Sequence, residues 1–110
     1  MKETIAEGCP VEETIELLGG RYTLLILRAL LYAGAPLRFG ELKRDIPAIS
    51  QKTLTRSLRQ LEGSGLLTRT VYAEVPPRVE YALTAAGEEL MPVFLAMRDW
   101  RERHGGLRVG

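Results

Sequence analysis

The stretch ISQKTLTRSLRQLEG, residues 49–63, carries the sharpest pattern in the chain. It opens on Ser50, a residue type that caps the start of a helix well. Three leucines recur at helical spacing and define one apolar side, namely Leu54, Leu58 and Leu61. At about 100° per residue, the opposite side carries Lys52, Arg56 and Arg59. The stretch therefore predicts a helix from about 50 to 63 with an apolar side toward a core and a cationic side toward solvent.

Three further helices are predicted before this stretch, at about 10–18, 22–33 and 39–46. The second of them is apolar on most sides, which favours a buried helix. Pro47 ends the third helix and leaves only a short turn before Ser50. Two helices joined by such a turn are typical of a helix-turn-helix motif.

After the stretch, the period changes from helical to alternating. Two predicted strands, 67–75 and 79–83, are joined at a tip that contains Pro76 and Pro77. A last helix is predicted at about 85–104, with Thr84 as its cap and an apolar stripe of Leu90, Val93, Phe94, Met97 and Trp100. The predicted fold is mainly α with a small β-hairpin (α+β), a winged helix-turn-helix in one domain of residues 1–110, whose wing is about 67–83.

Composition narrows the class of protein. The chain has 110 residues, a length that fits one domain, and a net charge of +1. Residues 38–78 hold eight Lys or Arg and four Asp or Glu, so the cationic excess lies in the middle of the chain. No apolar run is long enough to span a membrane, and the first five residues lack the apolar core of a signal peptide. With a single cysteine, these features predict a soluble cytoplasmic protein without membrane attachment.

The opposed faces of the predicted helix 50–63 favour DNA binding, because a helix can enter the major groove and present side chains to base edges. The hairpin can follow the backbone toward a neighbouring minor groove. The predicted DNA contacts are Lys43, Ser50, Gln51, Lys52, Thr55, Arg56, Arg59 and Arg78. For Ser50 and Gln51 the alternative is plain helix capping, and Arg69 could pair with Glu80 across the hairpin. The alternative function is a winged helix that binds proteins through an ordinary solvated surface.

Several motifs resemble the HxlR-type winged-helix transcriptional regulators, over roughly residues 9–104. They are CP at 9–10, GGRYTLLIL at 19–27, LRFGEL at 37–42, ISQKTLT at 49–55, LRQLE at 58–62, VPPRVEY at 75–81 and LTAAG at 83–87. The resemblance implies a bacterial or archaeal homodimer that binds double-stranded operator DNA. In it, Ser50 to Glu62 would be the recognition helix and Tyr72 to Tyr81 the wing. One departure is Arg21-Tyr22, where the family has a Lys-Trp-like pair.

The resemblance also implies that the N-terminal segment and the last helix form the dimer interface. The predicted interface residues are Leu90, Phe94, Met97 and Trp100, and the alternative is that this stripe closes the core of a single chain. Cys9 is a candidate redox sensor, because some members of the family respond to oxidants through a cysteine at this place. A thiol at a helix start gains reactivity, whereas the acidic residues Glu12 and Glu13 in the same turn oppose it.

The residues give no sign of catalysis. Three serines, one histidine and one cysteine stand in no hydrolase, kinase or phosphate-loop motif, so an enzyme is not expected. His104 has no second ligand near it in sequence, and no metal or cofactor is predicted. A small-molecule or oxidant effector remains open at this stage.

Overall fold

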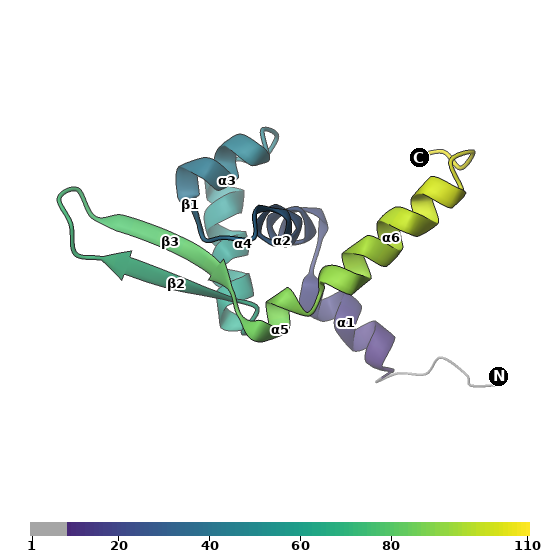
Figure 1. Cartoon of the computed structure of the whole chain (residues 1–110), viewed down its shortest axis with the longest axis horizontal. Helices are drawn as coiled ribbons and strands as arrows, with labels where there is room; N and C mark the ends of the chain where they lie inside the picture. The colour runs from purple at the N-terminus through teal and green to yellow at the C-terminus, as the bar shows by residue number, and fades with distance from the viewer. Residues whose placement is uncertain (1–8) are drawn as a thin grey trace.

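The computed structural model describes residues 9–110, so the prediction about a signal peptide, which rests on residues 1–5, lies outside the described residues. The elements are α1 (Pro10–Leu18), α2 (Arg21–Ala33), β1 (Leu37–Arg38), α3 (Phe39–Asp45), α4 (Gln51–Gly63), β2 (Leu67–Tyr72), β3 (Arg78–Leu83), α5 (Ala85–Glu88) and α6 (Met91–Arg103). Figure 1 shows α2, α3 and α4 as a central body, with the β2–β3 hairpin projecting from one end and α1 and α6 extending from the other. The predicted winged helix-turn-helix is confirmed.

The core lies among α2, α3, α4 and the base of the hairpin. The side chains with almost no exposed surface are Ile26, Leu27, Leu42, Ile49, Leu54, Leu58, Leu61 and Leu67. All three leucines predicted for the inner side of α4 are among them. This burial fixes the rotation of α4 about its axis, so the cations on its other side must point outward.

The hairpin belongs to a three-stranded antiparallel sheet in the order β1-β3-β2. The short strand β1 was not predicted; it pairs with β3, with Leu37 opposite Tyr81 and Arg38 opposite Glu80. Strand β2 ends at Tyr72 rather than at the predicted Val75. The physical reason is that Pro76 and Pro77 have no N–H to donate, so the ladder stops before them and residues 73–77 form the tip.

The prediction of one continuous last helix at 85–104 is wrong, because the structure has two helices there. α5 is only four residues long, and α6 begins at Met91 with Pro92 in its first turn. A proline in the first turn is tolerated, whereas inside a continuous helix it would remove a hydrogen bond and clash with the preceding turn. The chain therefore turns between Glu88 and Met91 and sends α6 away from the body (Figure 1).

The short helix α5 is anchored on the loop that joins α4 to β2. The Thr84 hydroxyl donates to the carbonyl oxygen of Gly65 at 2.7 Å and accepts from the N–H of Gly87 at 3.1 Å. A Cβ on Gly87 would lie 2.4 Å from the carbonyl oxygen of Leu66. Glycine is thus required here by close backbone approach, and α5 is held firmly at the end of α4.

None of the helices formed by residues 9–110 is both long and apolar enough to cross a bilayer.

Candidate nucleic-acid interface

The exposed side of α4 is the candidate interface. Ser50 caps the helix as predicted, because its Oγ accepts a hydrogen bond from the N–H of Thr53 at 3.1 Å. Gln51, Lys52, Arg56 and Arg59 are exposed, and Thr55 is half-buried beside them. The structure therefore brings together all five of the residues predicted within this helix.

These five side chains, Gln51, Lys52, Thr55, Arg56 and Arg59, line an open hollow of about 610 Å³. Three of them are cationic and two are neutral hydrogen-bonding groups. Guanidinium groups can bind phosphate or guanine with two parallel hydrogen bonds, and amide and hydroxyl groups can pair with base edges. The hollow thus offers the chemistry that DNA recognition needs on one helix face.

The cationic face continues toward the sheet. A second hollow of about 450 Å³ lies between α4 and the strands and is lined by Phe39, Thr55, Leu58, Arg59, Glu62, Arg69 and Tyr81. Arg59 and Thr55 line both hollows, so the two adjoin at these residues of α4. Arg69 was not among the predicted DNA contacts; its place opposite Tyr81 in the β2–β3 pair brings it here. The sequence alone did not give the pairing register of β2 and β3, and this register places Arg69 on the side of the sheet that faces α4.

The turn between α3 and α4 is fixed by burial of its two isoleucines, Ile46 and Ile49. The N–H of Ile49 donates to the carbonyl oxygen of Ile46 at 3.0 Å, which closes the turn. Lys43 is half-buried on α3, away from the five-residue hollow on α4. Its predicted contact with DNA stays a prediction.

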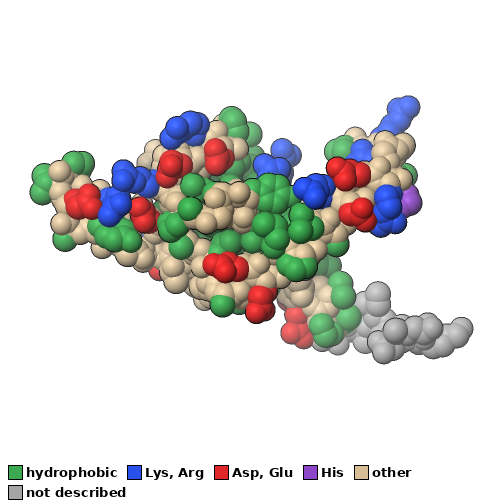
Figure 2. Space-filling view, viewed as in Figure 1, with side chains coloured by type: hydrophobic (Ala, Val, Ile, Leu, Met, Phe, Trp, Pro, Cys, Tyr) green, Lys and Arg blue, Asp and Glu red, His purple; other side chains and the backbone are tan. Residues whose placement is uncertain are grey.

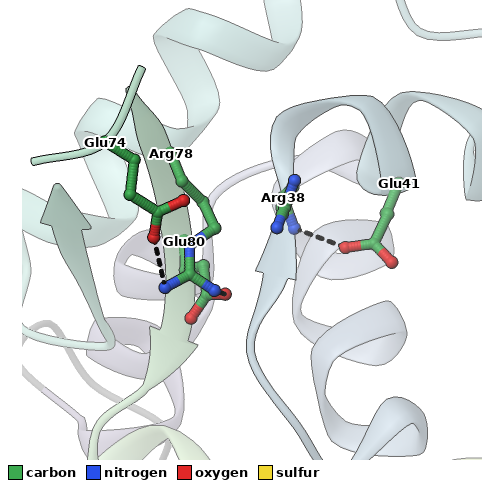
Figure 3. Close-up of polar contacts among 5 residues, drawn as sticks. All are labelled: Arg38, Glu41, Glu74, Arg78 and Glu80. Atoms are coloured by element: carbon green, nitrogen blue, oxygen red, sulfur yellow. Dashed lines mark hydrogen bonds and ion pairs between the residues drawn. The ribbon is translucent and has the colours of Figure 1, made fainter. Parts of the chain in front are cut away.

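Arg78, predicted to contact DNA from the wing, is engaged within the protein. Its guanidinium lies 2.9 Å from Glu74 and 3.2 Å from Glu80, and Figure 3 shows it between the two carboxylates. Glu80 thus pairs with Arg78 rather than with Arg69, the other partner that the sequence allowed. A contact between Arg78 and DNA stays a prediction, and it requires these ion pairs to exchange.

The four residues predicted for a dimer interface fall into two groups. Phe94 is buried in the core, only 7% exposed, and Leu90 is half-buried against that core. For these two residues the alternative reading, closure of the chain's own core, describes what the structure shows. Met97 and Trp100 are 48% and 50% exposed.

Met97 and Trp100 lie on the outer side of α6. With Pro92, Val93 and Ala96 they line an apolar groove of about 660 Å³. On α1, Val11 and Ile15 are also exposed. Figure 2 shows hydrophobic side chains gathered on the visible face where the helical body meets α6. Two helices at one end of the molecule thus carry exposed apolar side chains.

Cys9 is half-buried at the start of α1, and its side chain makes no capping hydrogen bond. His104 follows α6, and its ring lies 4.9 Å from the ring of Trp100. Within residues 9–110 no three His, Cys, Asp or Glu side chains are grouped so that they could hold a metal ion.

The chain is similar in sequence to a known family of helix-turn-helix proteins. Residues 17–108 match the family model described as HxlR-like helix-turn-helix. The uncharacterised HTH-type transcriptional regulator YdeP of Bacillus subtilis (strain 168) is 45% identical over 98 residues, which cover 89% of this chain and 75% of YdeP.

Two solved structures are similar along nearly the whole chain. The redox regulator HypR in its oxidised form has a TM-score of 0.78 and 39% identity, covering 93% of this chain and all of that chain. The reduced form of the transcriptional regulator YodB from B. subtilis has a TM-score of 0.76 and 39% identity, covering 88% of this chain and 94% of that one. These matches confirm the predicted class, a DNA-binding regulator rather than an enzyme. With its opposed α4 faces, its wing and these relatives, the chain belongs to the HxlR-like helix-turn-helix family.

Proposed function

We propose that this protein is a homodimeric transcriptional regulator that binds operator DNA by inserting α4 into the major groove. The observation that carries the proposal is the hollow on α4, where Lys52, Arg56 and Arg59 stand beside Gln51 and Thr55. Bound over a promoter, such a dimer would exclude polymerase and so act as a repressor. A regulator of this kind works in the compartment that holds the chromosome, which supports the predicted cytoplasmic location.

The test is binding of duplex DNA by the whole protein. Duplexes that bind best are selected from a random-sequence pool, and their affinity is compared with that of the unselected pool in a gel-shift titration. We expect a selected sequence with two-fold symmetry that binds at least about 10³-fold more tightly than the pool. No binding at low salt would instead favour a module that contacts only proteins.

The dimer in this proposal is formed by α1 and α6. Each helix carries exposed apolar side chains at helical spacing, Val11 and Ile15 on α1 and Val93, Met97 and Trp100 on α6. Packing them against a second copy would remove this surface from water and place two recognition helices about 34 Å apart, one turn of DNA. Trp100 is the anchor of the interface, since tryptophan is enriched among the residues that dominate binding energy.

Replacing Trp100 by alanine is expected to weaken the dimer by about tenfold or more, because the largest apolar side chain of the groove is lost. Sedimentation over a range of protein concentrations measures the change. The matched control is Tyr32→Ala, which removes an aromatic side chain 52% exposed on α2, away from the groove. An intact dimer in the Trp100 variant, or equal weakening in the control, would remove α6 from the proposed interface.

Cys9 is proposed to respond to oxidants. It is the only cysteine of the chain, so a disulfide would have to join two subunits or a small thiol. The support is its place beside α1, in the proposed interface, and the similarity to the redox regulator HypR.

Diamide treatment is expected to produce a covalent dimer, as the two Cys9 thiolates pass two electrons to diamide and form one disulfide. Non-reducing electrophoresis detects the product, and dithiothreitol should reverse it. Cys9→Ser is the control. A diamide-treated wild-type chain that stays monomeric on the gel, with no mass gain after exposure to glutathione disulfide, would mean that the thiol is structural.

A further inference from the structure

The wing carries a cation that the protein itself already neutralises. Arg78 begins β3, and its two terminal nitrogens reach Glu74 at 2.9 Å and Glu80 at 3.2 Å. Figure 3 shows the guanidinium enclosed between these two carboxylates, one from the tip and one from the strand. Each terminal nitrogen is therefore already paired with a carboxylate oxygen, and a phosphate would have to compete with these carboxylates for the guanidinium.

The remaining surroundings of Arg78 restrain it further. The guanidinium carbon lies 4.0 Å from the centre of the Tyr72 ring, directly across the β2–β3 pair. Its Nε is buried and has no acceptor among the described residues, and the side chain as a whole is 28% exposed. A ring on one face and carboxylates at the edge hold Arg78 against the hairpin.

The charge of the tip contrasts with that of α4. Residues 73–80 contain Glu74, Arg78 and Glu80, a net charge of −1. In α4, three cations line one open hollow. Phosphate contacts supply most of the sequence-independent affinity of a DNA-binding protein. A tip of this charge adds little to that affinity as long as the ion pairs persist.

We propose that Glu74 and Glu80 compete with DNA phosphate for the Arg78 guanidinium, so that Glu74 limits how strongly the protein binds DNA of any sequence. The inference rests on the proposed DNA-binding function, and it adds an affinity-setting residue that is itself anionic. Because phosphates carry no sequence information, restraint of Arg78 increases the share of the binding energy that comes from base edges.

Glu74 is the residue of choice for a test. It lies in the tip between the strands and its side chain is 52% exposed, so its replacement leaves the sheet intact. Glu80 is less suitable, because it is 20% exposed and stands within β3 between Thr70 and Arg38 of the neighbouring strands. Glu74→Gln removes the charge and keeps the size of the side chain.

Binding is measured by fluorescence anisotropy with a random-sequence duplex of about 30 base pairs, at salt concentrations from about 50 to about 200 mM. We expect Glu74→Gln to bind about fivefold more tightly than the wild type at the lowest salt, with a slope of log affinity against log salt that is steeper by about 1 per subunit, or about 2 for the dimer. The added contact is one released guanidinium on one phosphate per subunit.

A double-mutant cycle shows whether the effect passes through Arg78. In an Arg78→Gln background, Glu74→Gln should change the affinity by less than about twofold. Glu89→Gln, which removes one exposed negative charge directly after α5, is the control for net charge and should bind like the wild type. Thermal melting of each variant verifies that it is folded.

The possible results distinguish a failure of the competition for Arg78 from a failure of the proposed DNA-binding function. Wild-type affinity in Glu74→Gln, or a gain that persists in the Arg78→Gln background, would overturn the competition while leaving α4 as the DNA-binding element. A wild-type protein that binds neither random nor selected duplex at low salt would overturn the proposed function, and this inference with it.

Discussion

Reversing the charge of Arg56 and Arg59 together is expected to abolish detectable binding to duplex DNA. Both side chains are exposed on α4 and line the same hollow. One bidentate contact between arginine and guanine contributes about 1–3 kcal/mol, and a carboxylate in its place repels the phosphates. The variant Arg56→Glu with Arg59→Glu should therefore lose affinity by at least about hundredfold. A gel-shift titration with duplexes selected by the wild type measures the loss.

The matched control changes the net charge equally at a distance from α4. Arg28→Glu with Arg108→Glu alters two exposed arginines, one on α2 and one after α6, and should weaken binding far less. The single variant Arg59→Ala shows whether this side chain contacts a phosphate. If it does, the loss of that contact should reduce the slope of log affinity against log salt by about 1 per site. Equal losses in the two double variants would mean that only the overall charge matters, and α4 would lose its assigned role.

Adding one methyl group at Gly87 is expected to destabilise the fold severely. The Cβ of alanine would lie 2.4 Å from the carbonyl oxygen of Leu66 and 3.0 Å from the Leu83 side chain. Since the closest atom belongs to the backbone, relief requires α5 to move away from the loop that it is anchored to. We expect a loss of about 2–4 kcal/mol in the free energy of unfolding. Thermal melting should show a midpoint lower by about 10 °C or more.

Gly40→Ala is the control for this prediction. Gly40 lies in the first turn of α3, and a Cβ built there meets nothing within 4 Å. Alanine favours a helix over glycine by up to about 1 kcal/mol, so this variant should melt at or above the wild-type midpoint. A Gly87 variant as stable as the Gly40 variant would mean that α5 has room to shift without loss of packing.

Local sequence patterns were sufficient to predict the helix-turn-helix and the rotation of α4 about its own axis. The leucines of α4 repeat with the helical period, and Ser50 and Pro47 mark boundaries by their own backbone chemistry. The exposed cations follow from the same period without any knowledge of neighbouring elements. The candidate interface within α4 was therefore accessible to sequence reasoning residue by residue.

Features set by distant partners were not accessible in this way. Strand β1 is two residues long and exists because β3 offers it an edge. Phe94 and Met97 have similar places in a sequence pattern, yet only Phe94 reaches the core, because the turn after α5 decides where α6 points. Likewise, the ion pairs of Arg78 depend on the curvature of the hairpin tip, which brings Glu74 back over β3.

The anchoring of α5 has a mechanical consequence. Thr84 and Gly87 hold α5 against the loop that follows α4, and they thereby set the place from which α6 extends. Its 13 residues span about 20 Å, and a tilt of about 10° at the base displaces the far end by about 3.4 Å, the rise of one base pair. In the proposed dimer, a tilt of this size between the two α6 helices would change the distance between the two α4 helices by a length comparable to one base-pair step of DNA.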